Sequence, residues 1–248
     1  MKWRVVDFEY WNARMNMALD EAIGEAVISG SSPPTIRFYG WNPSAVSIGC
    51  FQSLKDEVDL DACRREGVDF VRRRTGGGAV YHDKDGEITY SVIAPEGVMA
   101  RDINKAYFTI CGWIVNALDV MEIPATFAPI NDILVEGSKI SGSAQTRRGG
   151  VFLQHGTVLY SVNPGKMFSI LKAGRTKISD KNISSFEERV TSILRHAKLS
   201  KDRVLKELRR SFTKGKEWEA GTYTEEEKNR ARQLVLGRYA SQEWNFSR

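Results

Sequence analysis

Cysteine is scarce in this sequence, and its few copies are scattered. The chain contains three cysteines, Cys50, Cys63 and Cys111, with no Cys-x-x-Cys pair and no histidine nearby at metal-ligand spacing. An odd, dispersed set of thiols indicates neither a disulfide framework nor a zinc site. Such a set is typical of a reducing compartment, so we expect a cytoplasmic protein.

Long apolar runs are also missing. No stretch approaches the roughly 18 consecutive apolar residues that a membrane helix needs. Residues 1–7 reach an acidic side chain before any apolar run of signal-peptide length. The sequence therefore predicts a soluble protein that is not exported and has no membrane partner.

A strong charge imbalance is the third absence. The chain has 36 Lys and Arg against 31 Asp and Glu, a net charge of +5, which is too weak to indicate a nucleic-acid partner. Only residues 195–216 are dense in basic side chains, and the interleaved Leu and Val predict helices with one solvated basic face. Charge alone does not tell whether an acidic protein or a phosphate backbone would bind there. A noncatalytic binding module therefore stays open as one alternative.

What the chain does contain is enough apolar material for a continuous core, 42% of its 248 residues. Strand-like and helix-like patterns alternate, which predicts an α/β (α+β) fold with mixed sheets flanked by helices. We expect strands at residues 3–8, 35–39, 45–48, 68–71, 88–93, 133–140 (two strands and a turn) and 151–162, and helices at 12–28, 59–67, 104–120 and repeatedly from 164 onward. Residues 35–48 have the pattern of a hairpin. A change to charged helices near Leu199 divides the chain into a larger domain, 1–198, and a small helical C-terminal region, 199–248.

The first candidate site is the segment 72–82, Arg-Arg-Arg-Thr-Gly-Gly-Gly-Ala-Val-Tyr-His. Three adjacent glycines leave backbone amides uncovered and permit positive φ, so the loop can approach a phosphate or a carboxylate closely. The flanking arginines, with His82 and Asp83, gather charge and titratable groups around one small volume. The loop lacks the Gly-Lys-Ser/Thr ending of a Walker A motif and the helix that follows a dinucleotide fingerprint. The sequence predicts an anion cradle of another kind.

A second candidate group lies between Asn131 and Gln145. Lys139 falls on a predicted strand, from which its ammonium would reach an anion held by the glycine loop. The small side chains that follow it allow a ligand to lie against the backbone. Asp132 offers hard oxygen ligands for Mg²⁺ on nucleotide phosphates. Further along, His155 is either a structural histidine or part of a ligand pocket, and its surroundings in the sequence leave both open.

These segments form four motifs in order: Arg-Arg-x-Thr-Gly-Gly-Gly-Ala-Val-Tyr-His-Asp, Asn-Asp, Lys-Ile-Ser-Gly-Ser-Ala and His-Gly-Thr. The combination resembles the lipoate-protein ligase A family, within the superfamily of biotin and lipoate protein ligases, from Trp3 to about Asn245. The resemblance implies an acyl-adenylate-forming catalytic domain over 1–198, with 199–248 as a possible accessory lobe. Such an enzyme activates lipoate or octanoate with ATP and Mg²⁺ and then transfers the acyl group to a lysine of a lipoyl domain.

The resemblance also implies roles for individual residues. Lys139 would be the catalytic residue, in contact with the acyl carbonyl and the α-phosphate. The substrate and nucleotide would be held by Arg72, Arg73, Gly76, Gly77, Gly78, Ala79, Val80, Tyr81, His82, Asn131, Asp132, Gly142, Ser143, Ala144 and His155, with Asp132 also holding Mg²⁺. The acceptor would be a lipoyl-domain protein, such as an E2 subunit, a glycine-cleavage H-like protein or another lipoate carrier protein.

The chain departs from the family pattern in two ways. Its flanks look more like octanoyl transferases that use a cysteine nucleophile, but the matching residue, just before Ala128-Pro129, is Thr126. A threonine without a base is a poor nucleophile, so we expect an ATP-dependent ligase rather than an ATP-independent octanoyl transferase or amidotransferase. Cys50, at the end of a predicted strand, is expected to be a bystander. The chain is also too short for the separate C-terminal domain of many such ligases, so we expect that either its own helices after Leu199 take that role or a second polypeptide supplies it.

Overall fold

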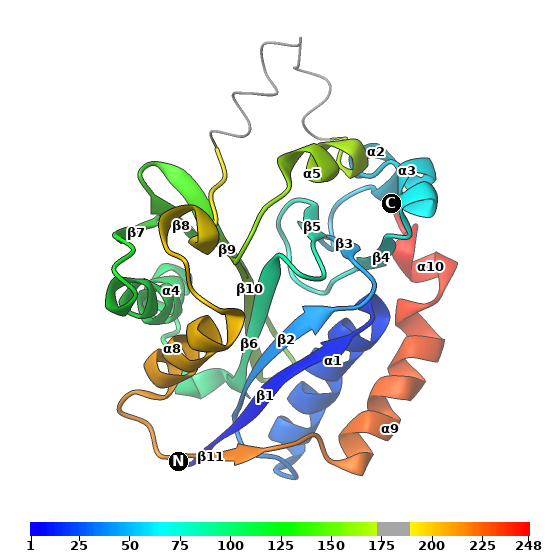
Figure 1. The fold of residues 1–248 in the computed structure, drawn as a ribbon. Coiled ribbons are helices and arrows are strands. Elements are labelled where there is room, and N and C mark those ends of the chain that lie inside the picture. The colour runs from blue at the N-terminus through cyan, green and yellow to red at the C-terminus, as the bar shows by residue number, and fades with distance from the viewer. Residues whose placement is uncertain (173–188) are drawn as a thin grey trace.

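A computed structural model of the protein describes residues 1–172 and 189–248. In chain order its strands are β1 (Trp3–Trp11), β2 (Thr35–Trp41), β3 (Ala45–Ile48), β4 (Asp69–Arg72), β5 (Val80–His82), β6 (Glu87–Pro95), β7 (Ala125–Ala128), β8 (Asp132–Val135), β9 (Ser138–Arg148), β10 (Val151–Leu159) and β11 (Trp218–Gly221). They form an eight-stranded sheet, in the order β11-β1-β2-β6-β10-β9-β8-β7, and a three-stranded sheet, in the order β4-β3-β5 (Figure 1). In the large sheet β1 runs parallel to β2 and to β11, and the other pairs are antiparallel.

Helices surround both sheets. They are α1 (Ala13–Ser29), α2 (Leu54–Glu57), α3 (Leu60–Glu66), the 3₁₀ turn η1 (Glu96–Val98), α4 (Ile103–Val120), α5 (Pro164–Ile170), α7 (Ile193–His196), α8 (Lys201–Thr213), α9 (Glu225–Leu234), the π-helical turn η3 (Val235–Tyr239) and α10 (Gln242–Asn245). The Asn12 side chain caps the start of α1 by accepting a hydrogen bond from the Met15 amide, and Gly30 ends the helix at a φ of 77°. Within the two described ranges, none of the helices is long and apolar enough to cross a membrane.

The large sheet lies between two helical layers. Successive strand residues point to opposite faces, so Val5 packs in the core formed with α4 and α8, and Val6 packs in the core formed with α1 and α9. Figure 1 shows α4 and α8 together on one side of the sheet and α1 with α9 on the other. The predicted α/β class, with mixed sheets flanked by helices, is confirmed.

The predicted hairpin at residues 35–48 is wrong. β2 pairs with β1 and β6 in the large sheet, whereas β3 pairs with β4 and β5 in the small one. All seven residues of β2 are buried, because the strand lies in the middle of the sheet with helices on both faces. Both of its edges are therefore already paired, and β3 has to leave for a second sheet. This separation opens the space in which the candidate site lies.

The C-terminal segment contains the predicted helices and one strand that was not predicted. β11 adds to the edge of the large sheet beside β1, α8 packs against α4, and α9 packs against α1. A buried ion pair, Arg4 with Glu227 at 2.6 Å, fastens α9 to β1. The division of the chain at residue 198 stays a prediction, and these contacts show that residues 199–248 pack on both faces of the large sheet.

Candidate active site

A cavity of about 140 Å³ lies where the small sheet meets strands β9 and β10 of the large one. It is lined by residues from all four predicted motifs: Arg73, Gly77, Gly78, Val80, His82, Asn131, Lys139, Gly142, Ser143, Ala144 and His155. The folded chain thus brings together segments that are more than 70 residues apart. Gly156 and Thr157, which follow His155 in the His-Gly-Thr motif, also line it, whereas sequence reasoning missed Met17, Tyr39, Trp41, Ser47 and Thr89.

Strand alternation explains several predicted residues that do not line this cavity. Val80 and His82 of β5 face the cavity, whereas Ala79 and Tyr81 pack into the apolar core of the small sheet. The carbonyl of Gly76 faces the Arg73 guanidinium. Only part of the segment 72–82 is therefore able to contact a ligand in this cavity through its side chains.

The glycine loop is packed against the residues that follow β3. A Cβ atom built on Gly49 would lie 2.0 Å from the Gly77 carbonyl oxygen, so only glycine fits there. The Cys50 amide donates to the Thr75 carbonyl at 2.9 Å. Gly77 has a φ of 93°, a conformation that favours glycine. The loop shape is thus fixed by close backbone contact.

Arg73 is the cation behind this loop. Its guanidinium makes five hydrogen bonds: Nε to Thr75 Oγ1, Nη1 to the carbonyl and the hydroxyl of Ser47, and Nη2 to the carbonyls of Gly76 and Gly78. A guanidinium has five N–H donors, and protein acceptors use all of them. Burial lowers the pKa of Arg73 to about 10, so it remains charged at neutral pH. Arg73 therefore shapes the loop and provides positive charge rather than a free donor.

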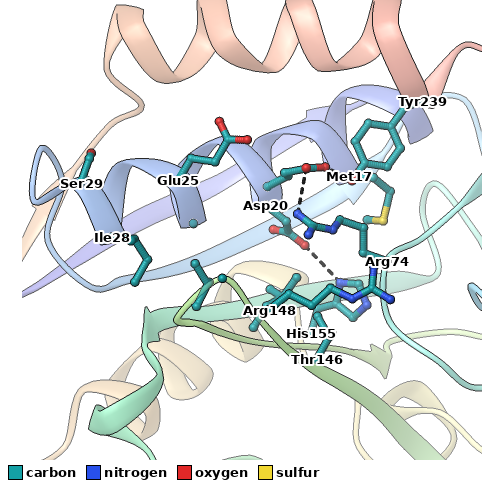
Figure 2. A pocket seen from close by; sticks show the side chains of 15 residues that line it. Met17, Asp20, Glu25, Ile28, Ser29, Arg74, Thr146, Arg148, His155 and Tyr239 are labelled. Atoms are coloured by element: carbon teal, nitrogen blue, oxygen red, sulfur yellow. Dashed lines mark hydrogen bonds and ion pairs between the residues drawn. The ribbon is translucent and has the colours of Figure 1, made fainter.

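Arg72 and Arg74 do not line this cavity. The Arg72 guanidinium donates to backbone carbonyls of the loop after β3 and of the C-terminal helix, at Gly49, Cys50, Gln52, Trp244 and Asn245. Arg74 pairs with Glu21 of α1 at 2.8 Å and lines a second cavity, of about 410 Å³, between α1 and strands β9 and β10 (Figure 2). The three consecutive arginines thus have different partners: backbone carbonyls after β3 and in the C-terminal helix for Arg72, the glycine loop for Arg73 and α1 for Arg74.

The two cavities adjoin each other. Met17 and His155 line both of them. Figure 2 shows His155 beside Asp20 at the floor of the larger cavity, with Arg74 reaching toward α1. An extended ligand would pass from one cavity to the other beside these two shared side chains.

Lys139 stands on β9 with its ammonium held over a glycine. Its Nζ lies 2.7 Å from Asp132 Oδ1, and a Cβ on Gly142 would lie 2.7 Å from the same Nζ atom. The absent side chain at 142 is therefore what gives the lysine its position. Within the described residues no group of three or more His, Cys, Asp or Glu side chains is arranged to hold a metal ion. A single carboxylate such as Asp132 nevertheless fits Mg²⁺ that arrives on nucleotide phosphates, because Mg²⁺ commonly takes one or two protein carboxylates and completes its shell with phosphate and water.

Both histidines of the cavity are bonded to buried carboxylates. His82 Nδ1 lies 2.7 Å from Glu87 Oε1, and the ring stacks on Trp41 at 3.9 Å. His155 Nδ1 lies 3.1 Å from Asp20 Oδ2. Burial would raise the pKa of Asp20, but the charge of Arg37 and the hydrogen bond from His155 outweigh it and keep that pKa below its usual value. Burial lowers the pKa of His155, so this histidine is neutral at pH 7.

The cysteines do not offer a nucleophile in this cavity. None of the three lines it. Burial raises the pKa of Cys111 and of Cys63 to about 11, so both remain thiols at neutral pH. Thr126 is exposed on β7, the edge strand of the large sheet, and does not line the cavity either. Cys50 is half-buried and, like the others, has no disulfide partner.

Comparison with known proteins places this geometry in a family. The family model of the lipoyl protein ligase A/B catalytic domain matches residues 12–213. The octanoyltransferase LipM of Geobacillus kaustophilus is 36% identical over 277 residues, with 99% of this chain and 98% of the relative covered. Among solved structures, the bi-partite lipoate protein ligase of Thermoplasma acidophilum has a TM-score of 0.88 at 33% identity, covering 99% of this chain and 96% of that one. A lipoate-protein ligase A bound with ATP has a TM-score of 0.84 at 31% identity and covers 99% of both chains.

Proposed function

The chain belongs to the lipoyl protein ligase A/B catalytic-domain family, and we propose that within this family of lipoate ligases and octanoyltransferases it is an ATP-dependent ligase. It would activate lipoate or octanoate as an acyl-adenylate and transfer the acyl group to a lysine of a lipoyl domain. The observation that carries the proposal is the position of Lys139, a fixed cation on the wall of the cavity that the glycine loop also lines. The choice of nucleotide is supported by the related structure that contains ATP.

The first step joins the acyl acid to AMP. A carboxylate oxygen attacks the α-phosphorus of ATP, the bond to the β-phosphate oxygen breaks, and pyrophosphate leaves with the displaced negative charge. The uncovered amides of Gly77 and Gly78 and the Lys139 ammonium would stabilise charge on the α-phosphate, because preorganised donors are most effective in a site that excludes water. Mg²⁺ held by Asp132 would neutralise the phosphates when the nucleotide is bound.

The second step transfers the acyl group. The acceptor lysine amine attacks the acyl carbonyl carbon, a C–N bond forms, the C–O bond to AMP breaks, and the amine loses a proton. Lys139 would then stabilise the carbonyl oxygen as its negative charge develops. The acyl chain would run past His155 and Met17, which join the two cavities.

An ATP-independent octanoyl transfer is the second candidate, and the name of the 36%-identical relative favours it. The family resemblance assigns such transferases a cysteine nucleophile, and this chain has Thr126 at that place. Its hydroxyl is exposed, outside the cavity, and no histidine bond to it is present among the described contacts. These observations lead us to place the ligase first.

The acceptor and the accessory chain are inferred from the relative of known structure. That Thermoplasma protein is described as a bi-partite ligase with its E2 lipoyl domain. We propose that this chain likewise acts on a lipoyl-domain protein and works with a separately encoded accessory polypeptide.

The deciding experiment is mass spectrometry of a lipoyl domain incubated with the protein. Octanoate or lipoate is supplied with and without ATP, and octanoyl-loaded carrier protein is supplied without nucleotide. A mass increase that requires ATP and free acid, with release of AMP, is the expected result. An increase from the carrier protein alone would establish the transferase instead.

A further inference from the structure

Two hydrogen-bond chains converge on Arg73, and the first begins at Asp20. Asp20 Oδ2 is 3.1 Å from His155 Nδ1, and His155 Nε2 is 2.8 Å from Thr75 Oγ1. Arg73 Nε donates to the same hydroxyl oxygen at 3.1 Å. We call Asp20, His155 and Thr75 the Asp20 chain.

The second chain has the same construction but different residues. Glu87 Oε1 is 2.7 Å from His82 Nδ1, and His82 Nε2 is 2.8 Å from Ser47 Oγ. Arg73 Nη1 donates to Ser47 Oγ at 3.2 Å. We call Glu87, His82 and Ser47 the Glu87 chain.

The direction of every hydrogen bond in both chains follows from their ends. An ionised carboxylate only accepts, so each histidine carries a proton on Nδ1 and donates it to Asp20 or Glu87. In a neutral ring Nε2 is then unprotonated and accepts from the hydroxyl of Thr75 or Ser47. A guanidinium only donates, so each hydroxyl also accepts from Arg73. Both histidines are thus fixed in the Nδ1–H tautomer.

The far ends of the chains are themselves immobilised. Asp20 also accepts from Arg37 at 2.9 Å and from Ser91 at 2.9 Å. Glu87 Oε1 also accepts from Trp41 Nε1 at 3.1 Å. Because all these groups are buried, the carboxylates cannot follow a displaced histidine without losing bonds that water would not replace.

The near end is the glycine loop. Arg73 Nη2 holds the carbonyls of Gly76 and Gly78 at 2.7 and 2.8 Å. With Nε and Nη1 fixed by the two hydroxyls, the guanidinium plane has a single orientation, and the loop carbonyls follow it. The part of the loop that lines the cavity, Gly77 and Gly78, is consequently positioned by buried residues of α1, β3 and β6.

We propose that Asp20, Thr75, Ser47 and Glu87 are positioning residues, which act through two one-way hydrogen-bond chains to hold Arg73 and the glycine loop in the shape that receives the acyl-adenylate. The structural half of this proposal is independent of the reaction, and its catalytic half rests on the proposed function. The residues that touch the ligand would be loop amides and Lys139, whereas the four positioning residues act through Arg73.

Nitrogen-15 NMR of the histidine rings tests the chains directly in the ligand-free protein. The sequence contains only three histidines, His82, His155 and His196. We expect His82 and His155 to show Nδ1 protonated and Nε2 unprotonated at pH 7. His196, which pairs with Thr191 away from the cavity, serves as the reference. A protonated Nε2 on either cavity histidine would overturn the proposal, whatever reaction the protein catalyses.

Kinetics test the positioning role. Thr75→Val removes the hydroxyl at nearly constant volume, and we expect KM for octanoate in the ATP-dependent reaction to rise about tenfold, as for one lost buried hydrogen bond. Thr75→Ser keeps the hydroxyl, so its KM should lie within about twofold of the KM of the unmodified protein. His155 should then also keep the Nδ1–H tautomer. A merely structural role would lower the melting temperature and the active fraction, hence kcat, without moving KM.

Ser47→Ala provides the second arm and should affect His82 but leave the His155 signals in place. If both variants fold and their KM values match that of the unmodified protein, the positioning role is refuted although the tautomers stand. If the unmodified protein forms no acyl-adenylate at all, the proposed function fails, and the NMR result still decides whether the chains exist.

Discussion

Replacement of Lys139 by methionine separates the catalytic contribution of the ammonium from its contribution to the fold. Methionine keeps most of the unbranched stem and removes the charge. In the structure the ammonium pairs with Asp132, but the two side chains are 41% and 34% exposed. An ion pair with that much solvent contact contributes roughly 0–1 kcal/mol to the free energy of unfolding. The melting temperature should therefore fall by no more than about 4 °C for a chain of this size.

The expected effect on the reaction is much larger. The ammonium lies on the wall of the cavity, where in the proposed reaction charge would develop on a phosphate and then on a carbonyl oxygen. Removal of one such preorganised donor lowers a rate by about 10²–10³-fold, or roughly 3–4 kcal/mol of transition-state stabilisation. Lys139→Met should thus reduce the rate of AMP formation by about 10²–10³-fold in a protein that remains folded.

The assay follows AMP and acylated lipoyl domain over time at saturating ATP, with melting curves measured on the same preparations. Lys2→Met is a matched control, because Lys2 forms a comparably exposed ion pair with Glu219 and does not line the cavity. The control should retain full activity with a similar change in melting temperature. Turnover of Lys139→Met within about fivefold of the unmodified protein, well short of the loss expected for a transition-state donor, would remove Lys139 from the mechanism.

Three further predictions concern the same site and its support. Gly142→Ala should lower the acylation rate at least about tenfold with little change in melting temperature, because the new Cβ displaces only the flexible end of Lys139; an unchanged rate would contradict this. Thr126→Ala should leave the ATP-dependent rate within about twofold, as expected of an exposed side chain outside the cavity, and a large loss would bring Thr126 into the mechanism. Glu227→Gln should cost about 3–5 kcal/mol in urea unfolding at neutral pH, because it leaves Arg4 buried without its counter-charge. Burial opposes ionisation of Glu227, but the hydrogen bond and charge of Arg4 hold its pKa below the usual value. The stabilisation is therefore present above the unfolded-state pKa of about 4.3 and is lost at lower pH. There the unmodified protein and Glu227→Gln should have similar free energies of unfolding.

The sequence predicts the site best where the responsible property is local. Small residues at Gly77 and Gly142 are visible in the sequence because a loop and a strand that approach a ligand closely need them. Lys139 follows from its place on a predicted strand next to small residues. Each of these lines the cavity. Local chemistry therefore locates the part of the cavity wall that the motifs form, but not the part formed by Met17, Tyr39, Trp41, Ser47 and Thr89.

The partners of the histidines could not be predicted in the same way. Asp20 lies in the middle of α1, and Glu87 begins β6, so each reads as an ordinary polar residue in its own segment. Both are bonded to a histidine only because the sheets bring distant segments together, over 135 residues in one case. The failed hairpin has the same cause, since strand pairing is chosen by burial on both faces and not by the turn between two neighbouring strands.

The three arginines before the glycine loop also have partners that only the tertiary structure determines. By sequence they form one positively charged cluster, but in the folded chain they contact three different parts of the protein. Arg72, whose amide also donates to the Asn245 side chain and whose carbonyl accepts from Trp244, joins the base of the glycine loop to the last helix of the chain. Arg73 joins the loop to Ser47 of the small sheet and, through Thr75, to His155 on β10 of the large sheet. The loop is thereby held from two directions, and the segment after residue 198 supports the site as well as the sheet. Loss of the bonds between α10 and Arg72 should therefore alter the conformation of the glycine loop.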